Sequence, residues 1–373
     1  MMSKNILIFG ISLKKGGAER IISLLVKEFI GDEKINIHLL MMEDGIEYQL
    51  PKNVKLVVLS KAKKSGLRKL LELPFVAWQL SKYIKQNNIS VVMSFLYRAN
   101  YINLLSTFFG TKHKSIINIV STTSRYLNEG LLGKVNLFLI NSLFNKADLV
   151  VSNSKGVDED LKSLINIRTK TQVIHNPIDI EYINEKKDTC EDAVFYFKNN
   201  IKYIISVGRL ISLKRNKDLI KAFYKLQESD DNIEVIFLGD GTLKDNLEKY
   251  CIELKIEQKV HFLGNVSNPF YYLNKSNLFV LNSELEGLPN VLLEAMACKL
   301  PVISSDCKSG PREILQDEKY GYLYPVGDTE ELIKKMKIVL YGDINLSKIK
   351  KNNLERIEDF RINKIMKKYK EIL

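Results

Sequence analysis

Residues 282–297 read NSELEGLPNVLLEAMA, and this stretch decides the fold. It follows the apolar run LFVL at residues 278–281, which is typical of a buried parallel strand, and it continues into the apolar periodicity of a helix. We predict that Pro289 is the first residue of this helix, a position that suits its restricted backbone. A turn from a strand into a helix leaves backbone N–H groups free to hold a phosphate or a sugar oxygen. The stretch therefore predicts a ligand site at the carboxyl end of a parallel strand.

Two carboxylates of this stretch, Glu286 and Glu294, are eight positions apart and are the first candidates for an active site. Asn290 shares one helical face with Glu294, because the two residues are at i and i+4. Paired carboxylates also occur in glycoside hydrolases, where one acts as an acid and the other as a base or nucleophile. The cations described below favour a different chemistry, since a hydrolase needs no clamp for a diphosphate.

Short apolar strands alternate with amphipathic helices from one end of the chain to the other. This alternation predicts an α/β protein with parallel sheets. The 373 residues exceed the usual size of one core, so we expect two domains. We place the amino-terminal domain at residues 1–178, a polar linker at 179–200 and the carboxyl-terminal domain at 201–352.

The composition argues against several classes of protein. With 45% apolar and 27% charged residues, the chain resembles an ordinary soluble globular protein. No uncharged apolar run reaches about 18 residues, so we expect no transmembrane helix. Residues 5–10 look like a first strand rather than a signal peptide, and we expect a cytoplasmic protein. The four cysteines are dispersed, which predicts neither a disulfide framework nor a zinc site.

The net charge of +12 predicts attraction to nucleic acid, to anionic lipid or to phosphorylated substrates. A cluster of cations surrounds the start of a predicted helix over residues 67–85, namely Lys61, Lys63, Lys64, Arg68 and Lys69. A basic amphipathic helix can rest on an anionic membrane surface. The alternative is a helix that packs on its own sheet and leaves its lysines in water.

Glycines stand at the ends of many predicted strands. Gly16 and Gly17 follow the first strand, where they let the backbone approach a ligand closely or form a plain strand-to-helix turn. They do not complete G-x-G-x-x-G, so the dinucleotide fingerprint is absent. Three strands of the carboxyl-terminal half end in Gly208, Gly239 and Gly264. Because the carboxyl ends of parallel strands share one edge of a sheet, we expect these glycines to line a crevice.

Cations follow several of the same strands. Arg209 and Lys214 come after one strand of the carboxyl-terminal half, where their donors suit a diphosphate and its charge as a leaving group. Solvated loop side chains are the alternative for both. Arg98 and Arg125 follow strands of the amino-terminal half and would face the same crevice as Gly16. We assign these two arginines to the acceptor side.

Residues 158–160 read DED and resemble a D-x-D metal signature. They fall in a predicted helix, where positions i and i+2 point in different directions. We therefore predict a solvated face and no metal site. The four histidines are isolated in the sequence, which argues against a role as ligand or catalytic base.

In combination, these motifs resemble the retaining GT-B glycosyltransferases of the family 4, or glycosyl transferase group 1, type. The resemblance covers close to the whole chain. Its pieces are GGAER at 16–20, NPID at 176–179, SVGRL at 206–210 with Lys214, LGDG at 238–241, FLG at 262–264, the E-x7-E stretch from Glu286 to Glu294, and PVIS at 301–304. The resemblance implies two Rossmann-like domains that face a central cleft. It also implies that a last helix, at residues 353–373, crosses back to the amino-terminal domain.

The resemblance further implies an activity. A hexose or N-acetylhexosamine would pass from a nucleoside-diphosphate donor to a hydroxyl, with retention at the anomeric carbon and without a metal or other cofactor. Glu286, Arg209 and Lys214 would be catalytic, with the two cations on the diphosphate and Glu286 on the sugar. Glu294 would bind the ribose. The other donor-binding positions would be Gly16, Gly17, Gly208, Gly239, Gly264, Gly287, Leu288 and Asn290.

Many members of this family carry a histidine at the carboxyl end of an amino-half strand, and residues 94–97 and 121–125, the comparable places here, contain none. We expect a glycan or lipid-linked glycan acceptor in the synthesis of lipid-linked oligosaccharide, lipopolysaccharide or capsule. The protein would act at the inner face of the cell membrane and would bind no nucleic acid. The alternatives are a sugar-nucleotide epimerase, a phosphorylase or a non-catalytic partner subunit.

Overall fold

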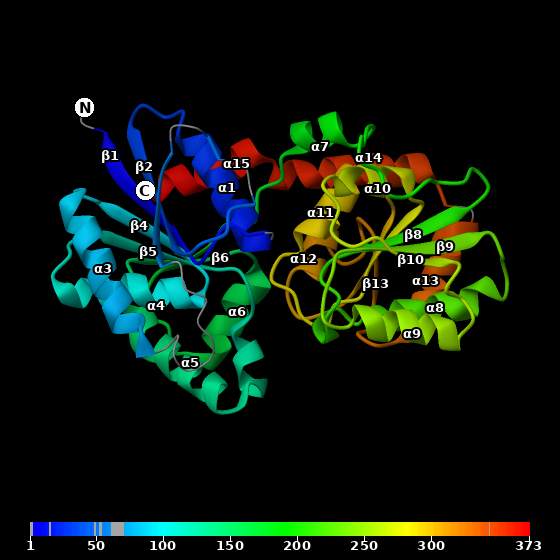
Figure 1. Ribbon diagram of the computed structural model, residues 1–373, viewed down its shortest axis with the longest axis horizontal. Coiled ribbons are helices and arrows are strands. Elements are labelled where there is room, and N and C mark those ends of the chain that lie inside the picture. Colours follow the sequence, from blue (N-terminus) through cyan, green and yellow to red (C-terminus); the bar gives the residue numbers. More distant parts are fainter. Residues whose placement is uncertain (1–2, 15, 48–49, 52–53, 61–70, 343) are drawn as a thin grey trace. The chain divides into compact units, whose positions relative to one another are not determined.

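The computed structural model describes residues 3–14, 16–47, 50–51, 54–60, 71–342 and 344–373. The basic segment predicted at residues 61–69 lies outside this part of the chain. Contacts define two compact units, Met1–Pro177 with Ile365–Leu373, and Ile178–Lys364. We call them the amino-terminal and the carboxyl-terminal unit. Each unit contains one parallel sheet flanked by helices, which confirms the predicted fold class (Figure 1).

In the amino-terminal unit the strand order is β3-β2-β1-β4-β5-β6-β7, and every pair is parallel. The strands are β1 (Lys4–Gly10), β2 (Ile35–Glu43), β3 (Lys55–Ser60), β4 (Val91–Phe95), β5 (Lys114–Ile119), β6 (Leu149–Ser152) and β7 (Thr171–Val173). The helices are α1 (Gly17–Phe29), α3 (Leu73–Gln86), α4 (Tyr97–Ser106), α5 (Gly130–Leu143), α6 (Lys155–Leu164) and α15 (Ile362–Glu371). Short 3-10 turns are η1 (Thr107–Phe109), η2 (Thr123–Asn128) and η3 (Phe144–Lys146).

Two layers of helices cover this sheet. Leu7 and Phe9 of β1 belong to a core cluster that includes residues of α3, α4, α5 and α6. Ile6 and Ile8 alternate with them and point to the opposite face, because side chains of a strand alternate in direction. Figure 1 shows α1 and α15 on that opposite side. Burial on both faces explains why the strands are continuously apolar rather than alternating.

A buried polar network ties α4 to the sheet. Asn100 Nδ2 donates to the carbonyl of Asn118 at 2.9 Å, and Asn118 Nδ2 donates to the carbonyl of Ser94 at 3.0 Å. Asn103 Nδ2 donates to Ser94 Oγ at 3.0 Å, and Asn103 Oδ1 lies 2.9 Å from His113 Nε2. Buried polar groups are tolerated when they are hydrogen-bonded. The network therefore lets a polar helix occupy the interior, where apolar periodicity alone would not place it.

His113 makes the stability of the amino-terminal unit depend on pH. Burial lowers the pKa of this imidazole to about 4 from its ordinary 6.5. Between these two pH values the imidazole binds a proton in the unfolded chain but not in the folded chain. The contribution of His113 to stability is therefore fully present above pH 6.5 and is lost as the pH falls toward 4. We expect a loss of about 3 kcal/mol in the free energy of unfolding.

Urea denaturation, followed by the fluorescence of the single tryptophan, Trp78, measures this loss in the free energy of unfolding as the pH is lowered. The H113Q variant should lack this part of the pH dependence, and an identical profile in both proteins would contradict the assignment.

The last residues of the chain return to the amino-terminal unit. Tyr369 of α15 is buried, and its hydroxyl donates to Asn118 Oδ1 at 3.4 Å. Lys114 Nζ at the start of β5 donates to the carbonyl of Ile372 at 2.8 Å. From Ile365 onward, helix α15 is therefore part of the core of this unit rather than a terminal extension.

In the carboxyl-terminal unit the strand order is β10-β9-β8-β11-β12-β13, again all parallel. The strands are β8 (Lys202–Val207), β9 (Ile233–Leu238), β10 (Val260–Phe262), β11 (Leu278–Leu281), β12 (Val302–Ser305) and β13 (Tyr322–Tyr324). The helices are α7 (Ile180–Lys186), α8 (Asn216–Gln227), α9 (Lys244–Glu253), α10 (Pro269–Lys275), α11 (Asn290–Ala297), α12 (Pro311–Leu315), α13 (Thr329–Tyr341) and α14 (Leu346–Ile357). The 3-10 turns are η4 (Ser212–Lys214) and η5 (Glu358–Phe360).

Three boundaries differ from the expectations. The stretch at 179–200, expected as a linker, begins with α7, whose Ile183 is buried in the core of the carboxyl-terminal unit. The segment at 353–373, expected as one helix, consists of the end of α14, then η5 and α15. Pro289 was predicted to be the first residue of a helix, and this is wrong by one residue. Its ψ of 103° is extended, so it caps α11, which begins at Asn290.

Candidate active site

Glu286 and Lys214 form an ion pair in the loops that follow two neighbouring strands. Lys214 Nζ lies 2.5 Å from Glu286 Oε1, and the side chains are 20% and 12% exposed. Lys214 follows β8 and Glu286 follows β11, and these strands pair directly. Ser283 Oγ donates to the same carboxylate oxygen at 2.6 Å. The pair is thus largely shielded from water, and the carboxylate is held by two donors.

The backbone around Lys214 is docked onto the loop that carries Glu286. Asn282 Nδ2 donates to the carbonyl of Lys214 at 3.3 Å, and Glu284 N donates to the carbonyl of Leu213 at 2.8 Å. Lys214 also ends the η4 turn, which is followed by Arg215 in the left-handed region with φ +45°. The ammonium therefore reaches Glu286 from a backbone that is itself fixed.

The loop after β12 supports Glu286 from the other side. Ser309 Oγ donates to the carbonyl of Glu286 at 2.8 Å. Gly310 has φ +81°, and a Cβ there would lie 2.5 Å from the carbonyl oxygen of Gly287, so only glycine fits. Cys307 of the same loop is buried, and burial, followed by the charge of Glu286, raises the pKa of its thiol to about 12. It therefore remains a neutral thiol beneath the site.

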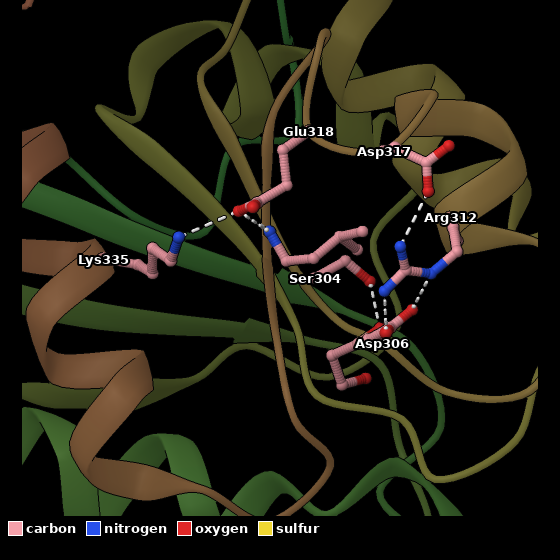
Figure 2. Close-up of polar contacts among 8 residues, drawn as sticks. Ser304, Asp306, Arg312, Asp317, Glu318 and Lys335 are labelled. Atoms are coloured by element: carbon pink, nitrogen blue, oxygen red, sulfur yellow. Dashed lines mark hydrogen bonds and ion pairs between the residues drawn. The ribbon is translucent and has the colours of Figure 1, made fainter.

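Arg312 holds the ends of this supporting loop together (Figure 2). Its Nε donates to Asp306 Oδ1 at 3.0 Å, and its Nη1 donates to Asp317 Oδ1 at 2.7 Å. Asp317 belongs to a run of three residues with positive φ, Gln316, Asp317 and Glu318, a conformation that non-glycine residues rarely adopt. Glu318 Oε1 accepts from Lys335 at 2.9 Å, as Figure 2 also shows. Ion pairs thus keep an unfavourable backbone in place behind the site.

The glycines predicted at the ends of three strands lie together. Gly208 N donates to the carbonyl of Leu238 at 2.9 Å, and Gly239 N donates to the carbonyl of Gly264 at 2.7 Å. Gly239 has φ +124°, and a Cβ there would lie 2.1 Å from the carbonyl oxygen of Gly208. No other residue fits such a close approach. Arg209 is the next residue after Gly208, and its side chain is exposed at this edge of the sheet.

Helix α11 carries the second carboxylate. Glu294 is only 4% exposed, and it lies on a helix whose other buried residues are apolar. Gly287 and Leu288 are buried in the loop just before the helix, whereas Asn290 at its first turn is partly exposed. The sequence placed Glu286 and Glu294 near each other along the chain, but the structure gives them different surroundings. Glu286 is paired with a cation, and Glu294 is enclosed by the core side of α11.

In the amino-terminal unit Gly16 and Gly17 lie at the start of α1, with Gly16 as its cap. The backbone just before them is pinned, since Leu13 N donates to the carbonyl of Gly45 at 2.9 Å. Arg98, in the first turn of α4, pairs with Glu43 at the end of β2 at 2.7 Å.

The second acceptor-side candidate, Arg125 of η2, pairs with Glu129 at 3.3 Å. The two segments that carry these arginines are neighbours, because Tyr97 Oη lies 2.8 Å from Thr123 Oγ1. Each arginine is nevertheless engaged in its own ion pair. Both arginines follow strands of the sheet and lie at its carboxyl edge, as predicted. Because each has its own carboxylate partner, the two do not form one cationic cluster.

The expectation of a solvated face at residues 158–160 is wrong. Asp158 and Asp160 are both buried. Asp160 Oδ2 accepts from the backbone N of Ser124 at 2.9 Å, and Asp158 Oδ2 accepts from Lys162 at 2.7 Å. Local hydrogen bonds within the unit explain why these carboxylates are inside. Among the described residues, no group of histidine, cysteine and acidic side chains could hold a metal ion.

Sequence reasoning missed two residues that contact Glu286, Ser283 and Ser309, and two that hold the supporting loop, Asp306 and Arg312. Ser283 lies three positions before Glu286, and that spacing could have drawn attention to it. The other three follow β12, and only its pairing with β11 brings them to the site.

Two parallel α/β units, with glycine-closed strand ends and a cation–carboxylate pair in the second, define the GT-B class of glycosyltransferases. Comparison with known proteins agrees with this class. Residues 15–182 match the model of Glycosyltransferase Family 4, and residues 191–356 match that of Glycosyl transferases group 1. The chain therefore belongs to the glycosyltransferases of the family 4, or group 1, type, and it is a glycosyltransferase.

Named relatives act in glycan synthesis. The chain is 37% identical, over 348 residues and 92% of each chain, to the N-acetylgalactosamine-N,N'-diacetylbacillosaminyl-diphospho-undecaprenol 4-alpha-N-acetylgalactosaminyltransferase of Campylobacter jejuni. It is 27% identical to the lipopolysaccharide 1,6-galactosyltransferase of Salmonella typhimurium, over 72% of this chain and 77% of that one. The crystal structure of HepE from Anabaena in complex with UDP has the same fold, with a TM-score of 0.78, 19% identity and coverage of 99% of both chains.

Proposed function

We propose that this glycosyltransferase transfers a hexose or N-acetylhexosamine from a nucleoside-diphosphate donor to a hydroxyl of a lipid-linked glycan. In this proposal the configuration at the anomeric carbon is retained, no metal or other cofactor takes part, and the enzyme works at the cytoplasmic face of the membrane. The observation that carries the proposal is the shielded pair of Lys214 and Glu286 at the glycine-lined edge of the carboxyl-terminal sheet. A cation beside a carboxylate suits a ligand that joins a phosphate to a sugar.

The donor would bind along this edge. Lys214 and the exposed Arg209 supply positive charge for the diphosphate, and their N–H groups can donate to its oxygens. Gly208, Gly239 and Gly264 allow the nucleotide to approach the backbone, since they carry no side chain. Glu286 would accept hydrogen bonds from the hydroxyls of the sugar.

The reaction would proceed on one face of the sugar. The bond between the anomeric carbon and the donor phosphate oxygen breaks, and the acceptor oxygen bonds to the same carbon from the same side. The acceptor proton passes to the departing phosphate oxygen, so the nucleoside diphosphate leaves with it. Arg209 and Lys214 would stabilise the negative charge that develops on that group. These two cations can supply the charge that a metal ion would otherwise bring.

The acceptor is inferred from the relatives. The Campylobacter jejuni enzyme is named for a diphospho-undecaprenol acceptor, and the Salmonella typhimurium enzyme for lipopolysaccharide. Arg98 and Arg125 lie at the carboxyl edge of the amino-terminal sheet, and their charge suits the diphosphate of a lipid-linked glycan. We therefore propose a lipid-linked glycan as the acceptor.

The direct test is product analysis with sugar nucleotides and a short-chain lipid diphosphate glycan. We expect a longer glycan only when donor and acceptor are both present, and NMR should find the donor's anomeric configuration in the product. Donor turnover without an acceptor would identify an epimerase, and turnover that needs inorganic phosphate would identify a phosphorylase. Nucleotide binding without any turnover would identify a non-catalytic subunit.

Glu294→Ala should weaken the binding of the free nucleoside diphosphate. If Glu294 accepts from the ribose hydroxyls, its removal costs a hydrogen bond to a charged group, which corresponds to about 10- to 150-fold in Kd. Calorimetric titration measures the change. Glu284→Ala is the matched control, because Glu284 is an exposed carboxylate of the same region. Since Glu294 is buried, the thermal midpoint of the variant must be recorded too. Unchanged nucleotide affinity in a folded variant would rule out the ribose role.

A further inference from the structure

Helix α3 exposes an aromatic stripe. Phe75 is 58% exposed, and its ring stacks on that of Trp78 with 5.9 Å between the centroids. Lys82, one turn further along the helix, places Nζ 3.7 Å from the centroid of Trp78. Positions 75, 78 and 82 share one face of a helix. Tryptophan is enriched at the boundary between water and lipid, where a lysine can keep its ammonium in water.

Helix α5 exposes a second apolar stripe. Leu131 and Phe138 are 77% and 69% exposed, and Leu132 is exposed beside them. Lys134 lies between these positions and is also exposed. A surface helix of a globular protein normally turns polar residues to water. The outer side of α5 instead exposes these apolar side chains together with Lys134, and its polar residues Asn141 and Ser142 lie at the far end of the helix.

The two helices that carry these stripes cover the same face of the sheet, because both contribute to the core cluster of Leu7 and Phe9. Helix α4 is buried and packs against both α3 and α5, so it lies between them (Figure 1). The η1 turn at its end exposes Phe108, which is 62% exposed. Lys146, just after α5, places Nζ 4.9 Å from that ring, and Lys85 of α3 donates to the carbonyl of Phe109 at 2.7 Å. We call this surface the α3–α5 face, made of Phe75, Trp78, Phe108, Leu131, Leu132 and Phe138.

The charge around this face is predominantly positive. The segments that form it, residues 71–86, 107–112 and 130–146, contain five lysines and one acidic residue, Glu72. Such a surface attracts an anionic partner. It disfavours a second copy of the chain, because a two-fold interface would bring the same lysines against each other.

We propose that the α3–α5 face docks the enzyme on an anionic lipid bilayer. This inference rests on the lipid-linked acceptor proposed above, since such an acceptor is held at a membrane. The apolar side chains would enter the headgroup boundary, while the lysines contact lipid phosphates. Within the described part of the chain, no helix is long and apolar enough to cross a bilayer. A peripheral face of this kind would bring the enzyme to its acceptor.

The single tryptophan of the chain makes the proposal directly measurable, because Trp78 lies in the face itself. The full chain is mixed with vesicles of phosphatidylglycerol and phosphatidylcholine at low salt. We expect a blue shift of Trp78 emission, quenching by brominated lipid, and co-sedimentation that weakens as salt increases. Vesicles of phosphatidylcholine alone should bind at least tenfold more weakly.

Two variants leave Trp78 in place as the probe. L131S/F138S should lower vesicle partitioning at least tenfold, and Lys134→Gln should lower it about fivefold. Both change exposed positions, so the thermal midpoint should remain that of the unmodified protein. Ile252→Ser is the control, because Ile252 is an exposed apolar residue of α9 in the other unit.

Several results would overturn the proposal. These are vesicle binding that L131S/F138S leaves unchanged, Trp78 emission that does not shift, and equal binding to neutral vesicles. A monomer–dimer equilibrium that L131S/F138S abolishes, without vesicle binding, would assign the face to a second copy. Vesicle binding without any sugar transfer would count against the proposed function alone. Transfer to a short-chain acceptor without vesicle binding would count against the face alone.

Discussion

Lys214→Met is expected to lower kcat/KM for sugar transfer by about 100- to 1,000-fold, the usual cost of removing one charge-stabilising donor from a transition state. Lys214 Nζ lies 2.5 Å from Glu286, and its backbone is held by Asn282. The ammonium is therefore positioned before the donor binds, and methionine fills the same space without charge. Initial rates with saturating and limiting donor measure the effect on kcat and KM separately.

Two controls separate catalysis from structure. Lys217→Met removes a nearby cation that lies over the ring of Tyr250, and it should leave the rate within about twofold. Glu286→Gln, alone and combined with Lys214→Met, shows whether the two side chains act as a unit, because coupled residues are not additive. A Lys214→Met enzyme with the rate of the unmodified protein would refute the role of this lysine.

Tyr369→Ala should destabilise the amino-terminal unit by about 3–5 kcal/mol, the range for removing a buried aromatic side chain. The ring is 3% exposed, and its hydroxyl bonds to Asn118 within the polar network under α4. Burial also raises the pKa of this phenol, so it stays protonated as a donor. Tyr369→Phe keeps the ring and should cost only about 1 kcal/mol.

Urea denaturation followed by Trp78 fluorescence reports on this unit, since Trp78 belongs to α3. Tyr196→Ala is the matched control, because Tyr196 is highly exposed in the other unit. Stability equal to that of the unmodified protein in Tyr369→Ala would mean that α15 adds little to the core. Such a result would also remove the physical reason for the chain to return to its first domain.

Much of the fold followed from local pattern. Short apolar runs predicted the parallel strands other than β13, because burial on both faces of a sheet demands such runs. Helical periodicity between them predicted the α/β class, and the length of the chain predicted two domains. The glycines at strand ends were predicted because a residue without a side chain lets the backbone approach closely. Gly239 packs directly against the backbone of Gly208 in this way. Asp160 was misjudged because its partner, the backbone N of Ser124, comes from a distant segment of the chain.

The sequence by itself determined the family, the strand-to-helix stretch at residues 282–297 and the residue types at the site, because these depend on spacing along one short segment. Only the tertiary structure decided which of them meet. Lys214 pairs with Glu286 because β8 and β11 are neighbours, and Ser309 reaches Glu286 because β12 lies beside β11. The α3–α5 face likewise exists only because α4 lies buried between two helices whose outer sides remain exposed. The order of strands in a sheet is set by contacts between distant parts of the chain, and no local pattern contains it.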